Sequence, residues 1–223
     1  MEQPNVKPEN HESLLQAIFP IIIHNGMKGT SMDKVAASLS MSKRTLYEIF
    51  GSKTEMLIAL IQYFHKKQLQ NVIDIFDHAP TIMHAFYRVL RLQQQTIQLI
   101  NVQFLQDMDE YYADLRSLYE NDHSQSSRDF LSAIDAGVKQ GVFRDDINYP
   151  VMIRMLRLQM ESLKRMEGLL PEDIKFNEAV ESISIGFLRS ISSHKGYDLL
   201  ENILAEERDI DLSHYLSFLE NKK

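Results

Sequence analysis

Apolar residues recur at helical spacing along most of the chain, and no stretch alternates as a half-buried strand would. This pattern predicts an all-α protein. The first helix is expected to end at Asn25-Gly26, and Pro20 within it predicts a kink or a local loosening. Further helices are expected at about 52–77, 81–99, within 104–140, at 149–166 and at 177–193, the last one closed by His194 to Gly196, with one or two amphipathic segments from Tyr197 onward.

The stretch from Thr30 to Lys53 predicts two short helices joined by a tight turn. Each has one apolar stripe, formed by Val35, Ala36 and Leu39 in the first and by Leu46, Ile49 and Phe50 in the second. Thr30, with Asp33 three residues later, predicts the start of the first helix, and Ser42 is expected to cap the second. Residues 40–42 alone separate the two, which is the length of a helix-turn-helix connection.

The second helix carries polar residues on the side opposite its apolar stripe. These are Lys43, Arg44, Thr45, Tyr47 and Glu48. Most of them are residue types that contact phosphates and base edges, as a DNA recognition helix requires. The same pattern would also occur in an ordinary helical hairpin with a solvated polar face, so the pattern alone leaves both interpretations open.

More specific residues are shared with one family. The segment from Ala17 to Leu57 resembles the DNA-binding region of the tetracycline-repressor (TetR) family of transcriptional regulators, over about a fifth of the chain. The resemblance is carried by Gly26, Thr30-Ser31, Val35-Ala36, Ser42-Lys43, Thr45-Leu46-Tyr47, Phe50 and Ser52-Lys53. It implies a three-helix DNA-binding bundle followed by a larger helical module for ligand binding and dimerisation.

On this basis we expect a disordered arm over 1–10, a helix-turn-helix domain over 11–53 and a helical ligand-binding and dimerisation domain over 54–223. The residues expected to contact DNA are Thr30, Ser31, Ser42, Lys43, Arg44, Thr45, Tyr47 and Lys53. Lys53 lies at a helix N-terminus, where a cation is unfavourable unless an anion binds, so we interpret it as a phosphate contact.

Two departures from the family pattern affect this site. Ser40 replaces the usual turn glycine, so its backbone should avoid positive φ or accept strain. Arg44 replaces a usually small residue and offers a guanidinium contact to guanine or phosphate.

The resemblance also implies a small-molecule inducer site and a four-helix interface between two subunits. The residues expected to line the inducer pocket are Met83, Phe86, Tyr87, Phe104, Met108, Tyr111, Tyr112, Met152 and Met155, although such residues are more often core. The interface is expected on the helices at 150–166 and 177–193, with Ala179, Ile183, Gly186, Phe187 and Ser190 on the contacting side. The alternative is that this side packs within the monomer.

Charge is distributed unevenly. The net charge is −7, but the segment from Met27 to Thr54 has five basic and two acidic residues, a balance of +3 that leaves −10 for the remainder. The absence of cysteine excludes disulfides and thiolate metal ligands. No run approaches the roughly 20 apolar residues that span a bilayer, and the first ten residues lack a signal-peptide core, so we expect a cytoplasmic protein that binds no membrane.

Enzyme motifs are incomplete. Glu120 and His123 have the Glu-x-x-His spacing of di-iron helical bundles, but the second motif that such a site needs is missing. We therefore expect no catalytic residue, no metal site and no cofactor. The sequence predicts a homodimeric, ligand-responsive repressor of a palindromic DNA operator, and the alternative is an all-α partner-binding scaffold that does not use its N-terminal bundle on DNA.

Overall fold

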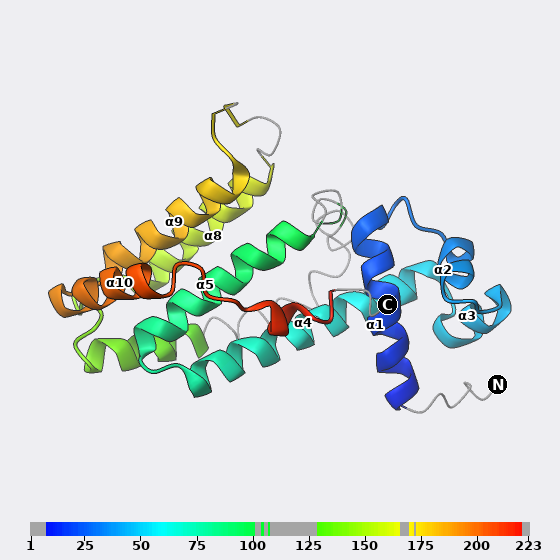
Figure 1. The fold of residues 1–223 in the computed structure, drawn as a ribbon, viewed down its shortest axis with the longest axis horizontal. Helices are drawn as coiled ribbons and strands as arrows, with labels where there is room; N and C mark the ends of the chain where they lie inside the picture. The colour runs from blue at the N-terminus through cyan, green and yellow to red at the C-terminus, as the bar shows by residue number, and fades with distance from the viewer. Residues whose placement is uncertain are drawn as a thin grey trace. The chain divides into compact units, whose positions relative to one another are not determined.

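The computed structural model describes residues 8–100, Phe104, Asp107, 129–165, 170–171 and 173–219. In these residues β-structure is limited to an isolated bridge between Phe143 and Ser192, so the all-α prediction is confirmed. The helices are α1 (Pro8–Asn25), α2 (Met32–Ser38), α3 (Lys43–Phe50), α4 (Lys53–His78), α5 (Ile82–Leu99), α8 (Tyr149–Arg165), α9 (Phe176–Ile191), α10 (His194–Glu206) and α11 (Ser213–Leu216) (Figure 1). Residues 129–139 are helical as well.

The chain divides into two compact units. The first comprises residues 1–73, 99–110 and 213–223, and the second comprises 74–98 and 111–212. The division between the units falls inside α4, between Ile73 and Asp74. One continuous helix therefore supplies residues to both units.

Helix ends follow the capping signals with two exceptions. Ser42 caps α3 by accepting a hydrogen bond from the Thr45 N–H at 3.0 Å, as predicted. The prediction that Thr30 starts the next helix after α1 is wrong, because Ser31 caps α2 and the Thr30 hydroxyl donates to the Gly26 carbonyl at 2.8 Å instead. His194 to Gly196 do not close α9 but form the first turn of α10, which Ser193 caps.

The core of the first unit is aromatic. Phe19 of α1 lies 5.3 Å, between ring centroids, from Phe64 of α4 and 5.9 Å from Phe104. Phe218, close to the C-terminus, packs on the same group at 6.0 Å from Phe19. The α1 helix continues through Pro20, and its buried face contacts this core. Aromatic residues from four distant parts of the sequence thus pack together and join α1 to α4.

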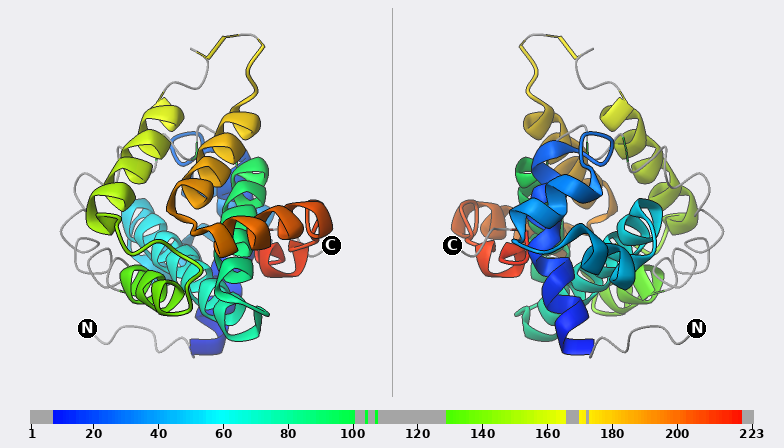
Figure 2. Two further views of the ribbon diagram at one scale, coloured as in Figure 1. Left: turned by 90° about the vertical axis from the view of Figure 1, so that its left-hand side faces the viewer. Right: turned by 90° about the vertical axis from the view of Figure 1, so that its right-hand side faces the viewer.

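The second unit has its own core, built by α5, α8, α9 and α10. Its buried residues include Phe86, Phe143, Leu188 and Leu200. Helices α8 and α9 lie side by side (Figure 2). Glu207, just after α10, accepts hydrogen bonds from the Arg88 guanidinium of α5, one of them at 2.9 Å from Nε. This ion pair fixes the end of α10 against α5.

Candidate nucleic-acid interface

The connection between α2 and α3 is short and tightly bonded. The N–H of Met41 donates to the Ala36 carbonyl at 2.9 Å, and Ser40 adopts a φ of 53°. This is the left-handed region, in which a residue with a Cβ is strained. Ser40, which replaces the turn glycine, was predicted either to avoid positive φ or to accept strain. It accepts the strain.

The α3 helix buries one side and presents the other to solvent. Leu46 and Phe50 are buried. Lys43 and Arg44 are exposed, and Tyr47 is 41% exposed. Thr45 is half-buried, and its hydroxyl lies 2.8 Å from the Ser42 Oγ. We define α1, α2 and α3 as the N-terminal bundle. Its third helix is short and capped, and the exposed side of this helix carries the cations.

Both exposed cations of α3 are paired with acids. Lys43 Nζ lies 2.6 Å from Asp33 of α2, and Arg44 Nε donates to Glu48 Oε1 at 2.8 Å. The hydrogen bond from Lys43 to Asp33 raises the pKa of Lys43, and the bond to Glu48 likewise raises the pKa of Arg44. Both side chains are therefore charged at neutral pH.

The remaining residues predicted to contact DNA differ in accessibility. Ser31 is exposed, and its Oγ accepts the Lys34 N–H at 3.2 Å. Thr30 is buried and its hydroxyl is engaged with Gly26. Lys53 is half-buried in the first turn of α4, next to a capping box in which the Glu55 N–H donates to the Ser52 Oγ at 3.1 Å.

Sequence reasoning missed the acidic partners of this surface. The spacing of four residues between Arg44 and Glu48 was a usable signal, because such residues are neighbours on a helix. The pair between Asp33 and Lys43 had no comparable signal, since it depends on how α2 packs against α3.

Those predicted inducer-pocket residues that the structure describes are distributed over two cores and the surface. Met83, Phe86 and Tyr87 belong to the core of the second unit, and Met152 packs against that core. Met155 is 50% exposed. Phe104 belongs to the aromatic core of the first unit, and Met108, Tyr111 and Tyr112 lie outside the described residues.

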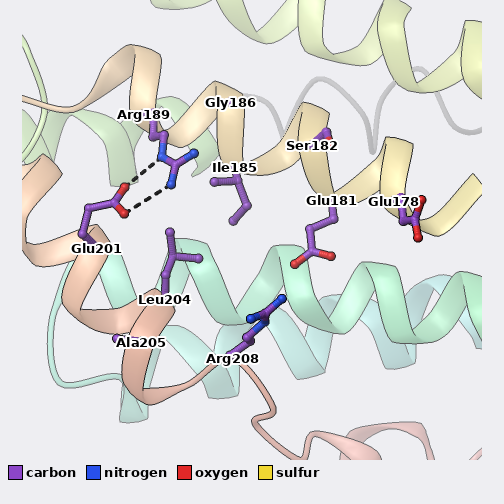
Figure 3. A pocket seen from close by; sticks show the side chains of 10 residues that line it. All are labelled: Glu178, Glu181, Ser182, Ile185, Gly186, Arg189, Glu201, Leu204, Ala205 and Arg208. Atoms are coloured by element: carbon purple, nitrogen blue, oxygen red, sulfur yellow. Dashed lines mark hydrogen bonds and ion pairs between the residues drawn. The ribbon is translucent and has the colours of Figure 1, made fainter. Parts of the chain in front are cut away.

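A pocket of about 640 Å³ lies between α9 and α10 in the second unit (Figure 3). Its lining is rich in charged residues, and Arg189 of α9 donates to Glu201 of α10 at 2.8 Å across it. Gly186 is the one residue in its lining that was predicted to lie on the dimer interface. The pocket is polar, unlike the methionine-rich and aromatic site expected from the sequence.

The predicted dimer residues on α9 are split between core and surface. Phe187 is buried, Ala179 and Ile183 are half-buried, and Gly186 and Ser190 are exposed. A Cβ added at Gly186 would meet no atom within 4 Å. On the neighbouring α8, a stripe of apolar residues is about half exposed, consisting of Val151, Met155 and Leu158.

Neither a metal site nor a membrane span is found in the part of the chain that the structure describes. Across residues 8–100, 129–165 and 173–219, no three potential metal-ligating side chains come together. The described helices also include none with enough length and apolar character to cross a bilayer.

Residues 14–60 match the model of the bacterial regulatory proteins of the tetR family. The HTH-type transcriptional regulator YvaF of Bacillus subtilis is 28% identical over 45% of this chain, a match that spans only 53% of that protein. The HTH-type transcriptional repressor KstR2 of Mycobacterium tuberculosis is 22% identical over 65% of this chain and 74% of its own length.

Solved structures share the fold over most of the chain. The ketosteroid transcriptional regulator KstR2 of Mycobacterium tuberculosis superposes with a TM-score of 0.58 at 17% identity, covering 86% of this chain and 100% of that one. A TetR-family transcriptional regulator from Rhodococcus sp. gives a TM-score of 0.61 at 17% identity, over 84% and 100% of the two chains. Residues 14–60 therefore match the N-terminal domain of the tetR family, and the chain as a whole shares the all-helical fold of these solved regulators.

Proposed function

We propose that this protein is a transcriptional repressor that binds a palindromic DNA operator as a homodimer and is released by a small molecule. The observation that carries the proposal is the outer side of α3, where Lys43, Arg44 and Tyr47 are exposed on a capped helix within the family's DNA-binding segment. The name of the related repressor from Mycobacterium tuberculosis supports repression rather than activation.

In this proposal α3 enters the major groove. Lys43 and Lys53 contact phosphates, while Arg44 and Tyr47 face base edges. Ser42 and Thr45 are engaged in the cap of α3, so their role is to fix the helix start next to the backbone. Thr30 is buried and supports the turn after α1, and exposed Ser31 can reach a phosphate.

Two bundles are needed because one helix-turn-helix reads only a few base pairs. The two N-terminal bundles of a dimer bind half-sites about 34–36 Å apart, which is one helical turn of DNA. The exposed stripe of Val151, Met155 and Leu158 follows the i, i+4, i+7 spacing of a helix-packing face. On the adjacent α9, Gly186 and Ser190 are exposed small residues that permit close backbone approach, so we assign the dimer contact to α8 and α9.

The effector is proposed to bind in the second unit. It can act only by binding more tightly to a state of the dimer in which the spacing of the two N-terminal bundles no longer matches that of the half-sites. Helix α4 runs from Lys53, at the proposed DNA contact, to His78 in the second unit, and it is the covalent route for such a change.

Fluorescence anisotropy with a labelled random-sequence duplex, repeated at several salt concentrations, tests the DNA-binding part of the proposal. The affinity should fall steeply as salt rises, because each phosphate contact releases counterions. Lys43→Ala and Lys53→Ala should each reduce the salt slope by about one. An all-α scaffold would show neither salt-dependent binding nor any effect of these substitutions.

A further inference from the structure

Arg44 is held by a single side chain. Its Nε donates to Glu48 Oε1 at 2.8 Å, and among the described residues no other hydrogen-bond partner of this guanidinium is found. The Arg44 side chain is 88% exposed and that of Glu48 is 52% exposed. Glu48, one turn further along the outer side of α3, therefore restrains this arginine, and no other residue in the described part of the chain orients it.

The bond to Nε leaves the outer edge of the guanidinium available. A guanidinium has five N–H donors in a planar fork, and only the one on Nε is used by Glu48. The two Nη groups can therefore still bind the O6 and N7 atoms of guanine in the major groove, which is the commonest specific arginine contact. Restraining Nε reduces the side-chain freedom that such a contact would otherwise remove.

The other acid on this surface serves as a comparison. Asp33 pairs with Lys43 at 2.6 Å, and both side chains are more than half exposed. A lysine ammonium is a compact point charge that rotates freely, so its orientation carries little base information. Both acids lower the local positive charge, but only Glu48 holds a side chain whose orientation matters.

Folding stability does not account for the pair of Arg44 and Glu48. Exposed ion pairs between residues four apart on a helix contribute little to folding, because water and salt screen them. A carboxylate close to the proposed phosphate contacts also repels DNA, which weakens binding to every sequence. Glu48 therefore lowers the general affinity for DNA and adds little to stability, so its benefit should lie in the choice of sequence.

We infer that Glu48 is a positioning residue for sequence specificity, which holds the guanidinium of Arg44 through Nε so that its Nη groups read a guanine in each half-site. This inference rests on the proposed DNA-binding function. It assigns to this chain a preference for guanine at one position of each half-site and traces that preference to two residues of α3.

The test is selection of bound duplexes from a randomised pool, followed by affinity measurements on the enriched sequence and on its guanine-substituted variants. The full chain is used, with Arg44→Ala, Glu48→Ala, Glu48→Gln and Asp33→Asn. The wild-type protein should prefer guanine at one position of each half-site by about tenfold, as expected for one bidentate contact. Arg44→Ala and Glu48→Ala should both lose that preference at the same position.

Two variants separate orientation from charge. Glu48→Gln keeps an acceptor oxygen for Nε, so it should retain most of the guanine preference although the negative charge is gone. Asp33→Asn also removes one negative charge from the surface, and it should keep the preference in full. All three acid-removing substitutions should tighten binding to random duplex, because each removes repulsion from phosphates.

A guanine preference that is unchanged in Glu48→Ala would overturn the inference and leave the proposed function standing. Loss of the preference in Asp33→Asn to the same extent would also overturn it, because the effect would then be one of charge alone. If the wild-type chain enriched no sequence and bound no duplex at low salt, both the inference and the proposed function would fall. Circular dichroism of each variant controls for folding.

Discussion

The fully buried carboxylate of Asp107 accepts a hydrogen bond of 3.0 Å from the backbone N–H of Lys28, in the turn between α1 and α2. Lys28 Nζ lies 3.9 Å from the other carboxylate oxygen. Both residues belong to the first unit, although 79 positions separate them in sequence. The turn that leads into the helix-turn-helix is thus fixed by a residue from the middle of the chain.

Replacing Asp107 should weaken the first unit. Asp107→Ala removes a charge-assisted hydrogen bond to a backbone donor in a buried site, so the free energy of unfolding should fall by about 1.5–3 kcal/mol. Asp107→Asn keeps an acceptor oxygen and should cost less. Urea denaturation measures both, and an unchanged midpoint in Asp107→Ala would show that the turn does not depend on this carboxylate.

Ser40 should be a site at which glycine stabilises the protein. Its φ of 53° costs a residue with a Cβ about 1–2 kcal/mol, part of which glycine regains despite its larger loss of entropy on folding. Ser40→Gly should therefore raise the free energy of unfolding by up to about 1 kcal/mol. Ser40→Val, with a branched Cβ, should lower it. The prediction fails if thermal unfolding places glycine at or below serine.

His84 should make stability depend on pH. Burial, reinforced by the nearby Arg88 charge and opposed by Glu207, lowers the pKa of His84 from its ordinary 6.5. As pH falls below that value, the unfolded chain takes up a proton that the folded chain does not, so His84 destabilises the fold increasingly in acid. The stability of His84→Asn relative to the wild-type protein should therefore improve from about pH 7.5 to about pH 5.

His78 provides a control of opposite sign for this pH series. It is exposed, and its hydrogen bond to the Asp74 carbonyl raises its pKa. A raised pKa contributes stability that is present in acid and lost as pH rises through it, so His78→Asn should become relatively less stable in acid. Identical pH trends in the two variants would refute the assignment of opposite shifts.

The exposed stripe on α8 should control assembly. Met155 is 50% exposed, and a carboxylate there would be desolvated in the proposed dimer contact. Met155→Glu should therefore shift the protein from dimer to monomer in sedimentation velocity. Leu69 of α4 is exposed to the same 50%, which makes Leu69→Glu the matched control that should stay dimeric. If Met155→Glu remained dimeric, the proposal that the dimer interface includes this face of α8 would be wrong.

Local signals predicted most of the fold. The cap at Ser42 and the stop at Gly26 depend on residues within one helical turn, so the sequence was sufficient for them. Ser31 rather than Thr30 caps α2 because the Thr30 hydroxyl has a competing acceptor at Gly26. Threonine and serine are both good N-cap residues, so these neighbours could not be separated without knowing that competition.

Long-range contacts lay beyond sequence reasoning. The bond from Lys28 to Asp107 and the packing of Phe218 on Phe19 join positions that share no local pattern. The inducer-pocket residues stay a prediction, because buried methionines and aromatics look alike in sequence whether they fill a core or line a cavity. Met83, Phe86 and Tyr87 fill the core of the second unit.

Methylation protection on an enriched duplex tests the central claim most directly, because dimethyl sulfate modifies guanine N7 in the major groove and adenine N3 in the minor groove. Two copies of α3 in successive major grooves should protect guanine N7 in two clusters whose centres lie about 10 base pairs apart. Protection confined to adenine N3, or a single protected cluster, would contradict the account of two paired α3 helices reading the major groove.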